Sequence, residues 1–355
     1  MTPPLISVVM VVRNVERFLA EAIESVLGQT CRDFEFIIVD FGSADKSKDI
    51  VSGYSARDSR IRLHEIASCG LAEARNAGCS LARGRYIAIM DADDVSLPDR
   101  LMLELEFMEK HPGVGVLGGA REWIDATGRS LFVNGDPTED HEIRSALAHR
   151  CPFCQPTVLI RAEAFASVGG YRAAFAPAED YDLWMRISEH FKCANLKQVL
   201  LKYRVHPQQV SLRNRKQQTL SVLAAQVSAS LRRNGEPDVL DTVGEITPEL
   251  LAGLGVPEAA QQTALASDYR DWARNMRIAG EYQVALKTVM EVLHSSDLEY
   301  AEERPIADLW LAAASLYWRQ KEFVSSLRGV ARAVMARPAV IGRPIKQLLE
   351  LLELA

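Results

Sequence analysis

Three aspartates directly after an apolar segment are the residues whose types and spacing most clearly suggest chemistry. Asp91, Asp93 and Asp94 follow the run Tyr86–Met90, which has the composition of a buried strand. Three carboxylates within four residues repel one another, and a divalent cation removes that cost. Mg²⁺ and Mn²⁺ prefer carboxylate oxygen, and phosphate oxygens commonly complete their coordination. The cluster therefore indicates a metal–phosphate site. The alternative is an acidic loop before a helix that begins near Pro98.

A further aspartate occupies a similar position earlier in the chain. Asp40 ends the apolar segment Phe34–Val39, just as Asp91 ends the segment Tyr86–Met90. Parallel sheets bind ligands beyond the carboxyl ends of their strands. Two strands of one sheet that both end in aspartate therefore predict a site at this edge.

The first 120 residues alternate between apolar segments and segments of helical periodicity, as such a sheet requires. Near-continuous apolar strands separated by helices are typical of a parallel sheet covered on both faces. We expect an α/β fold with a mostly parallel sheet. The expected strands are 5–12, 34–39, 61–64, 86–90 and 114–119, and the expected helices are 16–27, 45–56 with Asp45 as N-cap, 72–82 and 98–110.

Beyond about residue 212 the strand signals fade and the chain becomes helical. We therefore expect a catalytic domain over 1–212 and an all-α domain over 213–355, with a linker near 234–260. Two segments repeat at an offset of about 41 residues, since Gly280-Glu281-Tyr282 resembles Lys321-Glu322-Phe323. This spacing is longer than the ~34 residues of a tetratricopeptide repeat. We interpret 263–336 as tetratricopeptide-like helix pairs; two unrelated amphipathic hairpins are the alternative.

Composition narrows the class of protein. The 41 Lys and Arg against 47 Asp and Glu give a net charge of −6, which argues against a nucleic-acid partner. The apolar run at residues 5–12 is too short for a membrane span, which needs about 20 residues, and it lacks the features of a signal peptide. Six scattered cysteines fit a reducing compartment. We expect a cytoplasmic protein, free in solution or peripheral at the inner face of the membrane.

Ordered blocks over residues 4–212 resemble glycosyltransferase family 2. The amino-terminal blocks are Leu5–Met10, Asn14, Phe18–Leu19, Ala22–Thr30, Phe34–Asp40 with Gly42, Ser43 and Asp45, Gly70–Leu71, Ala74–Gly78, and Ile89–Asp94 with Pro98–Arg100. The later blocks are Gly169–Arg172, Ala178–Trp184 and Tyr203–His206. The resemblance implies an inverting enzyme with the A-type glycosyltransferase fold. It also implies a nucleotide-diphospho-sugar donor and Mn²⁺ or Mg²⁺ as cofactor.

The resemblance also implies roles for individual residues. Asp40 would face the nucleoside, Asp93 and Asp94 would hold the donor ribose and the metal, and Asp91 would orient them. Arg75 and Asn76 would lie near the nucleotide, although Arg75 has a neighbouring carboxylate as its alternative partner. His206 would lie near the metal or the diphosphate, since imidazole can serve either. The block that contains Glu179, Asp180 and Trp184 would form part of the acceptor and sugar side.

Asp180 falls at the family's general base, and the chemistry of inversion requires such a group. One carboxylate must take the proton of the attacking hydroxyl, while a cation stabilises the leaving diphosphate. Asp93 and Asp180 are 87 positions apart, consistent with separate elements of the fold. The alternative is that the acidic residues here only favour the start of a helix, expected over 181–190.

Three positions depart from the family pattern. Arg13 replaces the usual aromatic residue near the nucleobase, and Phe41 replaces the second of two adjacent aspartates. Either the base stacks on Phe41 and is held by Arg13, or the donor is not a uridine nucleotide; impaired binding is a third interpretation. Gln155 stands where many relatives have histidine. Its amide can hydrogen-bond a sugar hydroxyl, but it does not titrate near neutral pH.

The sequence thus predicts an inverting glycosyltransferase whose acceptor is a glycan or a lipid-linked glycan, as in bacterial surface polysaccharides. A catalytically impaired scaffold that acts through its helical tail is one alternative, and the tail could also form a homodimer or bind a protein partner. A sugar nucleotidyltransferase is another alternative. It is disfavoured because the segment Arg13–Glu16 lacks the glycine-rich phosphate loop of that class.

Overall fold

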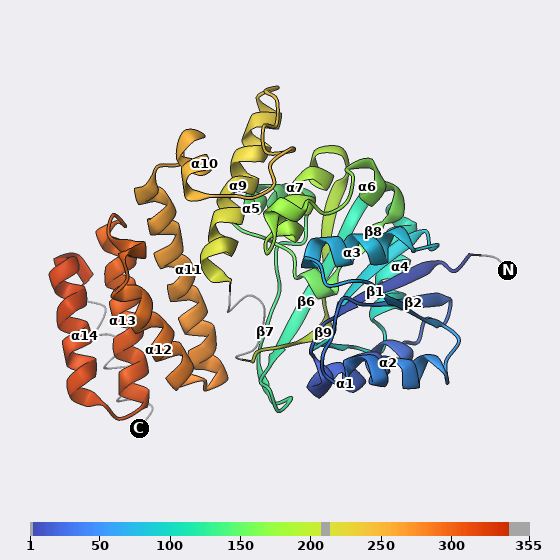
Figure 1. Ribbon diagram of the computed structural model, residues 1–355, viewed down its shortest axis with the longest axis horizontal. Coiled ribbons are helices and arrows are strands. Elements are labelled where there is room, and N and C mark those ends of the chain that lie inside the picture. Colours follow the sequence, from blue (N-terminus) through green and yellow to red (C-terminus); the bar gives the residue numbers. More distant parts are fainter. Residues whose placement is uncertain (1–2, 207–213, 341–355) are drawn as a thin grey trace. The chain divides into compact units, whose positions relative to one another are not determined.

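The computed structural model describes residues 3–206 and 214–340 (Figure 1). The chain divides into two compact units. The first comprises Met1–His206 and Ala224–Glu245, and the second comprises Pro207–Leu223 and Ile246–Ala355. Helix α9 (Arg215–Arg233) contributes residues to both.

The first unit carries the sheet. Its strands are β1 (Ile6–Val12), β2 (Phe34–Asp40), β3 (Ile61–Glu65), β4 (Tyr86–Asp91), β5 (Val95–Ser96), β6 (Val114–Ile124), β7 (Ser130–Asn134), β8 (Leu159–Arg161) and β9 (Lys192–Arg204). Its helices are α1 (Glu16–Leu27), α2 (Ser47–Ser55), α3 (Leu71–Ser80), α4 (Arg100–Lys110), α5 (Asp140–Leu147), α6 (Ala162–Ser167) and α7 (Glu179–His190). The expected strands and helices of the first 120 residues are present, with ends that differ by a few residues.

The sheet runs in the order β3-β2-β1-β4-β8-β6-β9-β5, and β7 pairs with β6. The pairs among β3, β2, β1 and β4 are parallel, as is β6 with β9. The predicted α/β class with a mostly parallel sheet is confirmed. One feature was not predicted: β8 pairs antiparallel with both β4 and β6, so β6 is not the direct neighbour of β4.

Side chains alternate between the two faces of β1 and bury both. Met10 lies in one apolar core with residues of α1, α2 and α4. The opposite face is covered by α3, where a Cβ atom at Gly78 would lie only 2.6 Å from Cγ1 of Val9. Figure 1 shows α1 and α2 on one side of the sheet and α3 on the other. This double coverage explains why β1 and β2 are buried along their whole length.

Strand register brings the two acidic strand ends to the same edge. Val12 of β1 pairs with Asp40 of β2, and Val11 of β1 pairs with Asp91 of β4. Because all three strands are parallel, their carboxyl ends lie side by side. The loops that follow β1, β2 and β4 therefore open onto one region.

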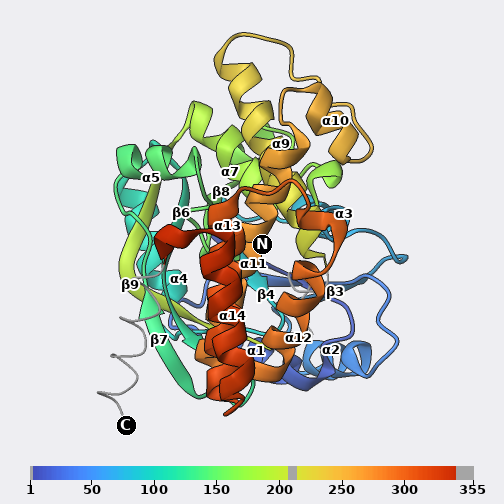
Figure 2. The same ribbon diagram turned by 90° about the vertical axis from the view of Figure 1, so that its left-hand side faces the viewer.

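The second unit is helical. It contains α10 (Pro248–Gly253), α11 (Glu258–Ala279), α12 (Tyr282–Leu293), α13 (Glu303–Arg319) and α14 (Phe323–Ala336). Helix α13 packs against α11, α12 and α14; Figure 1 shows α14 beside α13, and α14 is nearest the viewer in Figure 2. The turns after α11 and α13 match: Gly280 and Lys321, 41 positions apart, both have left-handed backbone, with φ of 85° and 64°. Across residues 3–206 and 214–340, no helix is both long and apolar enough to cross a membrane.

Candidate functional site

The acidic residues after β4 differ in burial and in partners. Asp94 is 1% exposed, and its Oδ1 accepts the backbone N–H of Arg204 at 2.7 Å. Its other oxygen is buried without a hydrogen-bond partner in the described part of the chain. Burial raises the pKa of Asp94 well above its ordinary value, and the charges of Asp93 and Asp91 raise it further. A positive charge bound here would relieve this repulsion.

Asp93 is more accessible and contacts the predicted histidine. Its Oδ2 lies 2.9 Å from Nε2 of His206, at the end of β9 and 113 residues away. His206 is 5% exposed, and its ring centroid lies 4.9 Å from that of Phe18. Its Nδ1 has no partner among the residues described. The structure thus brings together two of the three predicted metal ligands.

The third predicted ligand is oriented differently. Asp94 bonds to the backbone of Arg204, and in the described residues no three His, Cys, Asp or Glu side chains are arranged to hold a metal ion. Magnesium is usually held by only one or two carboxylates, with phosphate oxygens and water in the other positions. The carboxylate–imidazole pair of Asp93 and His206 suits such a shared site for Mg²⁺ or Mn²⁺.

Arg75, on α3, connects the acidic cluster to the start of α7. Its guanidinium bonds to Glu179 and, at 3.2 Å, to Oδ1 of Asp91. Arg75 is 8% exposed, and the neighbouring carboxylates outweigh its burial and raise its pKa. The structure thus shows the carboxylate partners that were the alternative for Arg75, and its predicted place near the nucleotide stays a prediction.

Asp180 lies in the first turn of α7, which begins two residues earlier than expected. Three acidic side chains occupy this turn, where the helix dipole favours negative charge. Asp182 pairs with Arg172 and Arg186, so its role is structural. Among the residues described, Asp180 accepts a hydrogen bond only from the N–H of Tyr181, at 2.8 Å. Burial, and then the charge of Glu179, raise the pKa of Asp180 to about 6. Such a carboxylate is ionised at neutral pH and is a stronger base than an ordinary aspartate.

The predicted nucleoside side is formed by the ends of β1 and β2. Oδ1 of Asp40 accepts the N–H groups of Gly42 and Ser43, both at 3.0 Å. Its Oδ2 is buried, with no partner in the part of the chain described. The guanidinium of Arg13 lies 5.6 Å from the centre of the Phe41 ring, and Phe41 is 8% exposed. The guanidinium, rather than the ring, therefore offers the larger exposed flat surface here.

Two polar side chains that were predicted to bind the donor or the acceptor, Asn76 and Gln155, hydrogen-bond Tyr171 in the structure. Asn76 donates to the carbonyl of Tyr171 at 2.7 Å and accepts its N–H at 2.9 Å. Both halves of this amide are thus used within the protein, and the place of Asn76 near the nucleotide stays a prediction. Gln155 donates to the hydroxyl of Tyr171 at 2.8 Å and is 7% exposed. Its Oε1 has no partner among the described residues.

Two residues predicted on the acceptor side are buried. Trp184 is 0% exposed, and its ring packs 5.7 Å from that of Phe153. Glu179 is 1% exposed and bonds to Arg75. Both belong to the buried residues of α7, and neither side chain is exposed in this structure. Their place on the acceptor side stays a prediction.

Sequence reasoning missed Arg204 as a structural centre of the site. Its backbone N–H donates to Asp94, its Nε donates to the carbonyl of Asp93 at 2.8 Å, and its Nη2 pairs with Glu21 at 2.7 Å. The only signal was its place in the block Tyr203–His206. These contacts fix β9, and therefore His206, against the acidic cluster.

Comparison with known proteins identifies the family. The model of glycosyl transferase family 2 matches residues 7–168. An uncharacterized glycosyltransferase of Methanocaldococcus jannaschii is 33% identical over 210 residues, which is 58% of this chain and 72% of that protein. The chain belongs to glycosyltransferase family 2. The O-antigen biosynthesis glycosyltransferase WbnJ of Escherichia coli is 30% identical to this glycosyltransferase over 206 residues, or 57% of this chain and 80% of WbnJ.

Solved structures show the same fold. Residues 1–349 of S. aureus TarS superpose on the glycosyltransferase with a TM-score of 0.52 and 16% identity, over 94% of this chain and 92% of that one. The mannosyltransferase PcManGT of Pyrobaculum calidifontis was solved with GDP-Man and Mn²⁺. It superposes with a TM-score of 0.52 and 17% identity, over 95% of this chain and 88% of that one. These likenesses establish the A-type glycosyltransferase fold that the sequence predicted.

Proposed function

We propose that this glycosyltransferase moves one sugar from a nucleotide diphosphate donor to a hydroxyl of a glycan or lipid-linked glycan, with inversion at the anomeric carbon. The observation that carries the proposal is the link Asp91–Arg75–Glu179, which holds the base candidate Asp180 beside the acidic cluster. The name of the WbnJ relative supports an acceptor in surface polysaccharide synthesis. TarS has been solved with UDP-GlcNAc and PcManGT with GDP-Man, which supports a nucleotide-sugar donor.

In the proposed reaction, Asp180 takes the proton of the acceptor hydroxyl. The hydroxyl oxygen then forms a bond to the anomeric carbon while the bond from that carbon to the diphosphate oxygen breaks. The proton stays on Asp180, and the nucleoside diphosphate leaves with the bonding electrons. A pKa of about 6 suits this role, because the carboxylate is ionised at pH 7 yet retains affinity for a proton.

Asp93 and His206 would hold Mn²⁺ or Mg²⁺ together with the donor diphosphate, and Asp94 would support them from beneath through Arg204. When bound, the cation stabilises the negative charge that develops on the leaving diphosphate. The free Oδ2 of Asp40 would accept a hydrogen bond from the nucleoside, and the Arg13 guanidinium would stack on its base.

The test separates binding from turnover. Calorimetry with UDP and GDP, each with and without Mn²⁺, should show one diphosphate that binds only with the metal. Asp93→Ala should weaken that binding at least about tenfold. Asp180→Asn should abolish transfer while nucleotide binding stays within about twofold, and Asp49→Asn, an exposed first-turn aspartate of α2, is the matched control. Retained turnover in Asp180→Asn would refute its role as base.

A further inference from the structure

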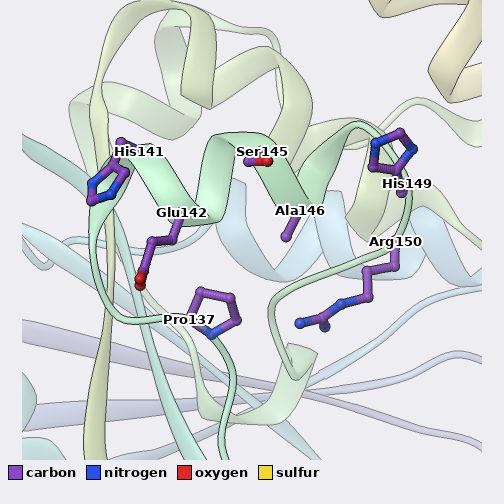
Figure 3. A pocket seen from close by; sticks show the side chains of 7 residues that line it. All are labelled: Pro137, His141, Glu142, Ser145, Ala146, His149 and Arg150. Atoms are coloured by element: carbon purple, nitrogen blue, oxygen red, sulfur yellow. The ribbon is translucent and has the colours of Figure 1, made fainter.

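A hollow beside α5 is lined by none of the residues of the candidate site. It has a volume of about 580 Å³ and is lined by Pro137, by the α5 residues His141, Glu142, Ser145 and Ala146, and by His149 and Arg150 (Figure 3). We call it the α5 pocket. Pockets for small ligands commonly have volumes of about 300–1,000 Å³. The α5 pocket is therefore large enough for a sugar residue.

The carboxyl end of α5 contacts the residue that follows the base candidate. The hydroxyl of Tyr181, the residue after Asp180, donates to the carbonyl of Leu147 at the end of α5, at 2.5 Å. The chain then passes His149 and Arg150 to Cys151. Burial raises the pKa of the Cys151 thiol, and the nearby charge of Asp180 raises it further. The segment that closes the pocket thus also passes the carboxylate that would accept the proton.

The loop on the other side of the pocket is held by two ion pairs that share the buried carboxylate of Asp136. Asp136 accepts from Arg150 at 2.7 Å through one oxygen and from Arg121 of β6 at 2.8 Å through the other. Asp136 precedes Pro137, which lines the pocket. Asp136 thus links the two sides of the hollow, the Pro137 side and the Arg150 side, and anchors them to β6 through Arg121. These links within the protein hold the hollow open without a ligand.

The chemistry of the lining suits a carbohydrate. Among the residues described, the side chains of His141, Glu142, Ser145 and His149 make no hydrogen bond or ion pair with the protein, so their donors and acceptors are available. Pro137 and Ala146 add apolar surface for the C–H face of a sugar ring. Arg150 is paired with Asp136, so the unpaired charge of the lining is that of Glu142, which disfavours a phosphate or carboxylate ligand because like charges repel.

We propose that the α5 pocket binds an uncharged sugar residue of the acceptor glycan, while a hydroxyl of the adjoining residue reaches Asp180. This rests on the proposed function, since it assigns the acceptor side of the same reaction. The pocket would then select acceptors by the sugar next to the one that is glycosylated. Donor binding would not depend on it, because the acidic cluster and Asp40 lie on other elements.

The test fills the pocket without disturbing the core. Ser145 is exposed on α5, so Ser145→Trp should block the hollow and leave the fold intact, and Ser52→Trp on α2 is the matched exposed control. The probes are p-nitrophenyl glycosides of glucose, galactose, mannose and N-acetylglucosamine, followed by saturation-transfer NMR. At least one should bind the wild-type protein, and Ser145→Trp should weaken it tenfold or more. Glu142→Ala should weaken it about threefold.

Nucleotide binding distinguishes the two hypotheses. UDP or GDP with Mn²⁺ should bind Ser145→Trp and the wild type within twofold. If nucleotide binds but no glycoside does, or if Ser145→Trp binds the glycoside as well as Ser52→Trp does, the acceptor subsite is refuted and the proposed function stands. If no nucleotide binds the wild type, the proposed function itself fails.

Discussion

Replacement of Glu179 by glutamine should move the acid limb of the activity profile to lower pH. Glu179 is 1% exposed and is next to Asp180, whose pKa is about 6 instead of 3.8. Burial is the largest cause, and the charge of Glu179 is the next; Arg75 acts in the opposite direction. Glu179→Gln removes the negative neighbour and leaves Arg75 in place, paired with Asp91. Both effects favour the ionised form of Asp180.

The size of the change follows from these causes. A shift from 3.8 to about 6 corresponds to about 3 kcal/mol of disfavoured ionisation. Burial persists in the variant, so we expect only part of the increase in the pKa of Asp180 to be lost. The pKa should fall by about one, to about 5. Asp180 must be ionised to act, so activity rises as pH rises through its pKa. At pH 5 about one tenth of the wild type and about half of the variant would be ionised, a relative gain of about fivefold.

The assay is release of nucleoside diphosphate, measured as kcat/KM between about pH 4.5 and 8. Glu163→Gln, an exposed first-turn glutamate of α6, is the matched control and should keep the wild-type limb. Thermal unfolding checks that Glu179→Gln remains folded. A folded variant whose limb moves to higher pH, or does not move, would refute the electrostatic role assigned to Glu179.

Three further predictions concern stability. Burial alone would raise the pKa of Glu35, but hydrogen bonds from Arg83, Ser7 and Arg62 lower it to about 2. Its stabilisation of about 3 kcal/mol is therefore complete above pH 4.5 and lost as pH falls from 4.5 towards 2, and urea unfolding at pH 7 and pH 3 should show Glu35→Gln less sensitive to pH than the wild type. Lys321→Gly should stabilise the helical unit by about 1 kcal/mol in urea unfolding, because glycine adopts a φ of 64° without strain. Gly170→Ala should lower the unfolding free energy by more than about 1 kcal/mol, because φ is 74° and the new Cβ would lie 2.7 Å from Oδ1 of Asn76.

Much of the first unit could be predicted because its signals are local. The apolar periodicity located β1, β2 and β4, and their parallel order placed Asp40 and Asp91 at one edge. The insertion of β8 between β4 and β6 could not be predicted, since Leu159–Arg161 is short and its pairing depends on contacts with distant residues. The expected N-cap at Asp45 is wrong for the same reason, because α2 begins at Ser47 and its N-cap is Lys46. The Asp45 carboxylate accepts the N–H of Ser47 but also that of Glu16, across to α1.

The candidate site shows a sharper division between what sequence can and cannot predict. Types and spacing pointed to Asp93, and the family resemblance pointed to His206 and Asp180, as candidates for chemistry. They could not indicate that Asn76 is used by Tyr171, 95 residues away, or that Arg75 bonds to Glu179, 104 residues away. Trp184 and Glu179 were assigned to the acceptor from their place in a motif. Only their burial shows that one fills the core and the other holds Arg75.

The ion pairs of Arg75 show how charge is distributed in the candidate site. One buried guanidinium is shared by Asp91 of β4 and Glu179 of α7, so these two carboxylates already outnumber the positive charge, and Asp180 adds a third. We expect a site with this surplus to attract cations and to hold a proton on its base more tightly than a carboxylate in water does. The same excess of negative charge therefore serves both halves of the proposed reaction. It favours a divalent ion at Asp93 and His206, and the charge of Glu179 adds to the larger effect of burial in raising the pKa of Asp180 to about 6, a value that suits proton transfer near neutral pH.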